Sequence, residues 1–93
     1  MSEYWQKLLT TRSGGDVKKG INLITTWAST FGYNSEQDVN EVIIYKKKGG
    51  GFLKRPQRLD VLSVKNQNGG ISVEVYNEEE SESLYRRITG RRE

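Results

Sequence analysis

Six cationic side chains lie in a short stretch of the chain that contains no carboxylate. They are Lys46, Lys47, Lys48, Lys54, Arg55 and Arg58, and they surround three consecutive glycines at 49–51. Because glycine disfavours a helix and like charges repel one another, the pattern predicts a flexible basic loop over 46–58. Clustered lysine and arginine side chains neutralise the phosphates of a polyanion, so the chemistry indicated is electrostatic binding.

Phe52 lies inside this basic loop, where no apolar core pattern continues. Two interpretations stay open for it: an anchor that packs the loop onto the domain, or an exposed group that stacks on a base. The loop itself is either a nucleic-acid contact or a solvated segment that keeps an edge strand from aggregating. Arg91 and Arg92 follow the last predicted helix and are expected to assist in binding a partner.

The composition excludes several classes of chemistry. The chain has no cysteine and no histidine, so disulfides, thiolate nucleophiles, imidazole catalysis and the common zinc sites cannot form. Acid–base or Mg²⁺ chemistry would have to use carboxylates and a lysine near the sheet, such as Asp60, Glu41, Glu74 and Lys65. No spacing in the chain demands that chemistry, so we expect no enzyme, no metal site and no cofactor.

The expected partner follows from where the charges lie, since the net charge is only +3. We expect a small non-catalytic protein that clamps DNA or RNA through the basic loop, with tolerance of sequence. The alternative is a protein–protein interaction module, meaning an inhibitor, immunity or adaptor protein, whose loop contacts an acidic groove on another protein. The sequence does not distinguish DNA from RNA or a single strand from a duplex. It also leaves open whether the protein forms a homodimer.

Length and hydropathy limit the classes of protein to which the chain can belong. Ninety-three residues form one domain with a thin core. The chain has no basic-then-apolar leader, and none of its apolar runs approaches the roughly 20 residues needed to cross a bilayer. We therefore expect a single soluble domain over residues 1–93, located in the cytoplasm, with no membrane partner.

Apolar spacing predicts two helices in the first third of the chain. Ser2 is expected to cap the first helix, which ends before Gly14. The second helix starts at Asp16, and its apolar stripe consists of Val17, Ile21, Ile24, Ala28 and Phe31. Trp5 and Trp27 lie on or beside apolar stripes, so core packing is the favoured role for both.

A hairpin is predicted around Asn68-Gly69, because this dipeptide supplies the two positive φ angles of a type I′ turn. The turn sets the register of the flanking strands over 59–65 and 71–76. The predicted pairs are Val64 with Val73 and Leu62 with Val75 on the buried face, and Ser63 with Glu74 and Val61 with Tyr76 on the half-exposed face. Tyr45 and Tyr76 are expected to flank that second face, where they contact a ligand or cover a thin core.

The remaining segments complete the predicted fold. Ser35 and Asp38 have the spacing of a helix start, so a helical turn over 36–40 is expected before a strand at 42–45. Asn77, followed by three glutamates, opens a last helix that stops at Gly90. The predicted fold class is α+β: two N-terminal helices, a three-stranded antiparallel sheet and a C-terminal helix, in the order ααβββα.

Overall fold

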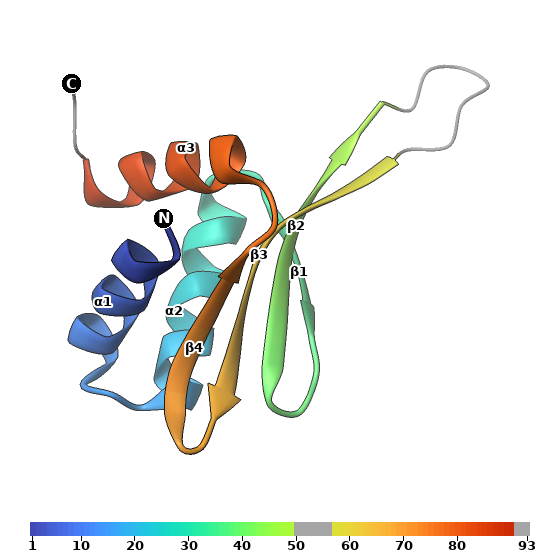
Figure 1. The fold of residues 1–93 in the computed structure, drawn as a ribbon. Coiled ribbons are helices and arrows are strands. Elements are labelled where there is room, and N and C mark those ends of the chain that lie inside the picture. Colours follow the sequence, from blue (N-terminus) through green and yellow to red (C-terminus); the bar gives the residue numbers. More distant parts are fainter. Residues whose placement is uncertain (50–56, 91–93) are drawn as a thin grey trace.

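Three helices and four strands make up the described part of the chain, residues 1–49 and 57–90, in a computed structural model (Figure 1). Their order is α1 (Ser2–Ser13), α2 (Val17–Thr30), β1 (Asn34–Gln37), β2 (Glu41–Lys48), β3 (Gln57–Gln67), β4 (Gly70–Val75) and α3 (Glu78–Thr89). The α+β class is confirmed. The predicted three-stranded sheet is wrong in one detail, because the sheet has a fourth strand.

β1 is the additional strand. Residues 34–37 are extended and pair with residues 42–45 of β2, where we expected a helical turn. Asp38 forms the connecting turn: its carboxylate accepts a hydrogen bond from the Val39 N–H at 2.7 Å, and its own N–H donates to the Glu41 carbonyl at 2.7 Å. The helix-start spacing is a local signal, and a continuous ladder of backbone hydrogen bonds to β2 outweighs it.

The four strands form one antiparallel sheet in the order β1-β2-β3-β4. Asn68 and Gly69 have φ angles of 55° and 81°, which confirms the predicted turn between β3 and β4. The register is also as predicted, with Leu62 opposite Val75, Ser63 opposite Glu74 and Val64 opposite Val73. The turn therefore determined which residues of the hairpin share a face.

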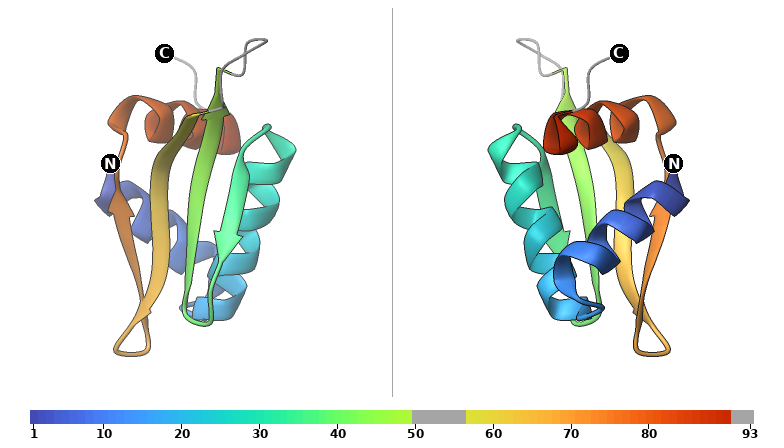
Figure 2. Two further views of the ribbon diagram at one scale, coloured as in Figure 1. Left: turned by 90° about the vertical axis from the view of Figure 1, so that its right-hand side faces the viewer. Right: turned by 90° about the vertical axis from the view of Figure 1, so that its left-hand side faces the viewer.

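All three helices lie on one face of the sheet, and within residues 1–49 and 57–90 no helix covers the opposite face (Figure 2). The buried core between the layers includes Trp5, Leu9, Ile21, Ile24, Ala28, Val42, Ile44, Leu62, Val64, Val73 and Leu84. Core packing is confirmed for Trp5, which is fully buried, and Trp27 is partly buried and packs against the same core. We call the uncovered side the open face.

A β-bulge interrupts the pairing of β2 with β3. Ile44 pairs with Leu62 and Tyr45 pairs with Asp60, so Val61 is an extra residue in β3. Val61 is fully buried, and its predicted place on a half-exposed face is wrong for this reason. From the bulge toward the start of β3, the side chains alternate between the two faces with a shift of one residue. This shift turns Asp60 and Arg58 toward the open face beside Tyr45.

The helix ends follow mostly local rules. Asp16 caps α2 by accepting from the Lys19 N–H at 3.2 Å, and Asn77 caps α3 by accepting from the Glu80 N–H at 2.9 Å. Ser2 is not a cap as expected, because α1 already includes it. Within the described ranges, every helix is too short or too polar to span a bilayer.

Candidate nucleic-acid interface

β2 and β3 continue past the rest of the sheet as a two-stranded ribbon (Figure 1). Pairing with β1 reaches only to Tyr45 of β2, and pairing with β4 reaches only to Leu62 of β3. Residues 46–48 and 57–59 therefore pair only with each other. We call these six residues the ribbon, and no other strand of the described residues pairs with either of its edges.

The ribbon corrects the predicted loop over 46–58 at both ends. Lys46, Lys47 and Lys48 belong to β2, and Arg58 belongs to β3. A strand forms here because each of these residues has a partner on the facing strand, which satisfies its backbone polar groups. The predicted site residues that lie outside the described residues are Phe52, Lys54, Arg55, Arg91 and Arg92.

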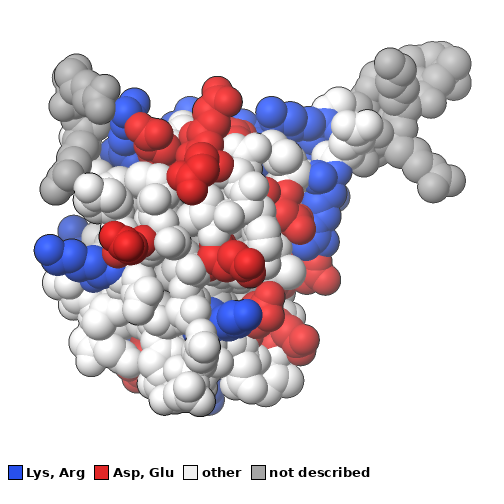
Figure 3. Space-filling model, in the orientation of Figure 1, with Lys and Arg blue, Asp and Glu red and all other residues white. Residues whose placement is uncertain are grey.

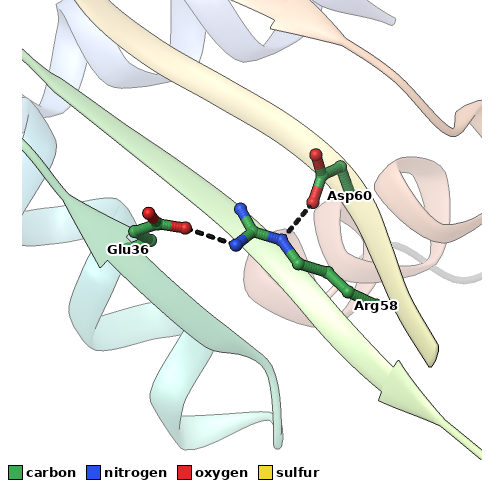
Figure 4. Close-up of polar contacts among 3 residues, drawn as sticks. All are labelled: Glu36, Arg58 and Asp60. Atoms are coloured by element: carbon green, nitrogen blue, oxygen red, sulfur yellow. Dashed lines mark hydrogen bonds and ion pairs between the residues drawn. The ribbon is translucent and has the colours of Figure 1, made fainter. Parts of the chain in front are cut away.

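Arg58 is held on the open face by two carboxylates (Figure 4). Its Nε donates to Asp60 Oδ1 at 2.7 Å, and its Nη1 donates to Glu36 of β1, so the side chain crosses over β2. These hydrogen bonds, first to Asp60 and then to Glu36, raise the pKa of the Arg58 guanidinium. The guanidinium also lies over the Tyr45 ring, with 4.2 Å between its central carbon and the ring centroid.

Lys46 points to the opposite side of the sheet, toward α3. Its Nζ lies 3.3 Å from Glu80 Oε2, close enough for an ion pair but not aligned as a hydrogen bond, and 5.4 Å from the centroid of the Tyr33 ring. The Tyr33 hydroxyl donates to the other Glu80 oxygen at 3.4 Å. Burial, together with the Glu80 charge, raises the pKa of Tyr33. Lys46 thus compensates a carboxylate that is only 16% exposed.

Lys47 and Lys48 differ from these two cations. Both side chains are exposed, and neither has a carboxylate partner among residues 1–49 and 57–90. We call Lys46 and Arg58 the compensated cations, and Lys47 and Lys48 the uncompensated lysines. The uncompensated lysines are the ones whose charge is available to a phosphate without first breaking an ion pair.

Sequence reasoning missed the carboxylates that reach the ribbon. Glu36, Asp60 and Glu80 come from β1, β3 and α3, and all three contact one of the compensated cations. Figure 3 shows the result, because acidic and basic atoms lie beside one another near the ribbon rather than forming a patch of one sign. The signal available in the sequence was weak, since only Asp60 lies near the basic stretch.

Neither metal chemistry nor similarity to known proteins adds a function to this site. In the part of the chain that the structure describes, no group of three or more acidic side chains is arranged to hold a metal ion. No protein-family model, curated protein or solved structure matches the chain. The ribbon and the open face are therefore the features from which a function can be inferred.

Proposed function

We propose that this protein binds nucleic acid through the ribbon, by electrostatic contacts that tolerate differences in sequence and without catalysis. The observation that carries the proposal is the ribbon itself, whose edges pair with no further strand of the described residues and whose uncompensated lysines are exposed. Lys54 and Arg55 follow in the sequence between its two strands and add two cations without a carboxylate. A cytoplasmic location is part of this proposal.

The shape of the ribbon supports the choice of partner. Two strands lie about 5 Å apart, and the major groove of B-DNA is about 12 Å wide and admits a two-stranded ribbon. The ribbon carries no acidic side chain of its own, so its outer end can approach phosphates closely. Contacts of this kind go to the backbone of the nucleic acid and carry little sequence information.

The proposal is tested by measuring binding to random-sequence duplex and to single strands across a salt series. Contacts from the four cations Lys47, Lys48, Lys54 and Arg55 should give a log–log slope of about −3 to −4 on duplex DNA. Replacing Lys47 and Lys48 by alanine should flatten the slope by about two and weaken binding to every sequence alike. Because both side chains are exposed, the melting temperature of this variant should match that of the wild type.

A Lys18→Ala, Lys19→Ala variant is the matched control, because these two exposed lysines lie on α2. It loses the same net charge and should bind with an unchanged slope. Failure of the wild type to bind duplex DNA, single-stranded DNA or RNA at about 50 mM salt would refute the proposal. The acidic groove of a protein partner would then become the leading candidate, to be sought among proteins that co-purify with the wild type but not with the ribbon variant.

A further inference from the structure

Two flat groups are presented on the open face of the sheet. One is the Arg58 guanidinium, whose central carbon lies 4.2 Å from the centroid of the Tyr45 ring, and the other is the ring of Tyr76, which follows β4. Tyr76 is 48% exposed, so much of its ring is accessible to a ligand. Planar groups exposed on one face of a sheet are suited to ligands that have planar groups of their own.

Arg58 is poorly suited to act as a phosphate ligand. Its charge is compensated by Glu36 and Asp60, and a phosphate would have to displace one of them. The same two carboxylates hold the guanidinium in place (Figure 4), and in this position it lies over the Tyr45 ring. The guanidinium lies over the ring, yet the Arg58 side chain is still 41% exposed, so part of its planar surface remains available for stacking.

Tyr76 is held just as firmly. Its hydroxyl donates to Glu74 Oε2 at 3.1 Å and lies 3.2 Å from the Ser63 hydroxyl. The ring therefore covers Ser63, which is only 1% exposed although it faces the open side. Because the ring is fixed before any ligand arrives, stacking on it costs little conformational entropy.

The two flat groups lie at the same level of the sheet, along a line that crosses its strands. Tyr45 lies on β2 opposite Asp60 of β3, while Tyr76 follows β4 and its N–H donates to the Val61 carbonyl at 2.9 Å. β3 lies between β2 and β4, so the backbone positions of Tyr45 and Tyr76 are about 10 Å apart. Lys47 lies two residues beyond Tyr45 on the same face of β2, about 7 Å along the strand, and has no carboxylate partner among the described residues.

We propose that the open face binds the unpaired bases of a single-stranded nucleic acid. One base stacks on the guanidinium of Arg58, a second stacks on Tyr76, and Lys47 contacts the phosphate beside the first base. Bases in a duplex have their flat sides covered by neighbouring pairs, so only an unpaired strand can use these surfaces. This inference rests on the proposed nucleic-acid binding and adds a preference for single strands.

The charges of the open face favour this ligand over duplex DNA. On this face Glu36 and Asp60 are paired with Arg58, and Glu74 adds a further carboxylate, so the closely spaced phosphates of a duplex laid across the sheet would meet little net positive charge. A single strand can turn its bases toward the sheet and its phosphates toward solvent and Lys47. The carboxylates can also accept hydrogen bonds from the amino groups of bases.

The test compares oligo(dT) of about 16 nucleotides with a random-sequence duplex of the same length, by fluorescence anisotropy at one salt concentration. The wild type should bind the single strand more tightly. Tyr76→Leu keeps an apolar side chain but removes the ring, and it should weaken binding to oligo(dT) by about 10-fold with an unchanged salt slope and unchanged duplex binding. Tyr76→Phe keeps the ring and should retain binding to oligo(dT).

Tyr76→Leu also removes a hydroxyl near Ser63, so its fold is checked by its melting temperature against Tyr76→Phe, which lacks the same hydroxyl. Equal affinity of the wild type for both probes, with no effect of Tyr76→Leu, would overturn this inference and leave the ribbon proposal standing if Lys47→Ala still weakens binding. An Arg58→Gln variant provides a second test, because it removes the flat cation and should weaken oligo(dT) binding alone. Loss of duplex binding to the same extent would show instead that Arg58 contacts phosphates.

Discussion

The compensated cations and the uncompensated lysines come from one basic stretch, yet they lie in different electrostatic surroundings. Lys46 and Lys47 are consecutive residues of β2 with the same chemistry, but Lys46 faces α3 and Glu80, whereas Lys47 has no carboxylate partner in the described part of the chain. Successive side chains of a strand point to opposite faces, so a run of like charges in a strand is divided between two environments. Charge counted along a sequence is therefore not the charge available to a ligand.

The largest difference between the two groups is expected in nucleic-acid binding. Lys47→Ala should reduce the magnitude of the log–log salt slope by about one, because an exposed lysine releases a counterion when it contacts a phosphate. Lys46→Ala should change the slope much less, because Lys46 is already paired with Glu80. Both slopes are measured on the same duplex by titration across a salt series. Equal changes would mean that Lys46 leaves Glu80 when nucleic acid binds.

In thermal stability, Lys46→Ala should have the larger effect and Lys47→Ala the smaller one. Lys46→Ala leaves Glu80 without its cation at a site that is only 16% exposed, so the free energy of unfolding should fall by about 1 kcal/mol, or about 4–8 °C in Tm. Lys47→Ala should leave Tm unchanged. Calorimetry on both proteins decides the comparison, and a Tm for Lys46→Ala equal to that of the wild type would show that the ion pair does not stabilise the fold.

Arg58→Lys is expected to have a smaller effect on stability. An ammonium cannot hold Glu36 and Asp60 in a fork or lie flat on the Tyr45 ring, so the free energy of unfolding should fall by about 0.5–1 kcal/mol. Glu36→Gln is the matched control and should cost less, because Glu36 is 59% exposed and Asp60 still pairs with Arg58. Urea unfolding measures the free energy of unfolding of both variants. A larger loss for Glu36→Gln than for Arg58→Lys would show that the contacts of Arg58 do not dominate this cluster.

The smallest effect concerns alkaline pH. The folded protein raises the pKa of Tyr33, by burial first and by Glu80 second, so this group stabilises the fold at pH values below the ordinary tyrosine pKa of about 10. That contribution is lost as the pH rises through the raised value, because a phenolate beside Glu80 would be repelled. Tyr33→Phe should remove this part of the alkaline loss of Tm. An identical alkaline profile for both proteins would exclude Tyr33 as a contributor.

Several features of the fold were predictable because they depend on residues close together in the chain. The cap of α3 at Asn77 is a contact within three residues, and the turn at Asn68-Gly69 depends on the φ angles of two residues. The helical stripe of α2 and the hairpin register follow from periods of 3.6 and 2 residues. These features depend on neighbouring residues and on periodic spacing, which can be seen in the sequence, so they were predicted correctly.

The candidate site was predicted only in part. The sequence identified the basic stretch and placed Tyr76 on the exposed side of the hairpin, and the structure has Tyr76 48% exposed. It did not show that Lys46 and Arg58 are paired, because Glu36 is 22 residues from Arg58 and Glu80 reaches Lys46 only through the packing of α3 on the sheet. Pairing over such separations depends on how the elements pack.

Local sequence patterns specify the helices, strands and turns and the sign of the charges that they carry. Which of those charges are available to a ligand depends on how the elements pack. The bulge at Val61 shifts the alternation of β3, and this one extra residue places Arg58 on the open face above Tyr45 instead of beneath the helices. The physical reason is that a strand has a period of two, so which face a side chain occupies depends on pairing with another strand, and no local sequence pattern specifies that pairing.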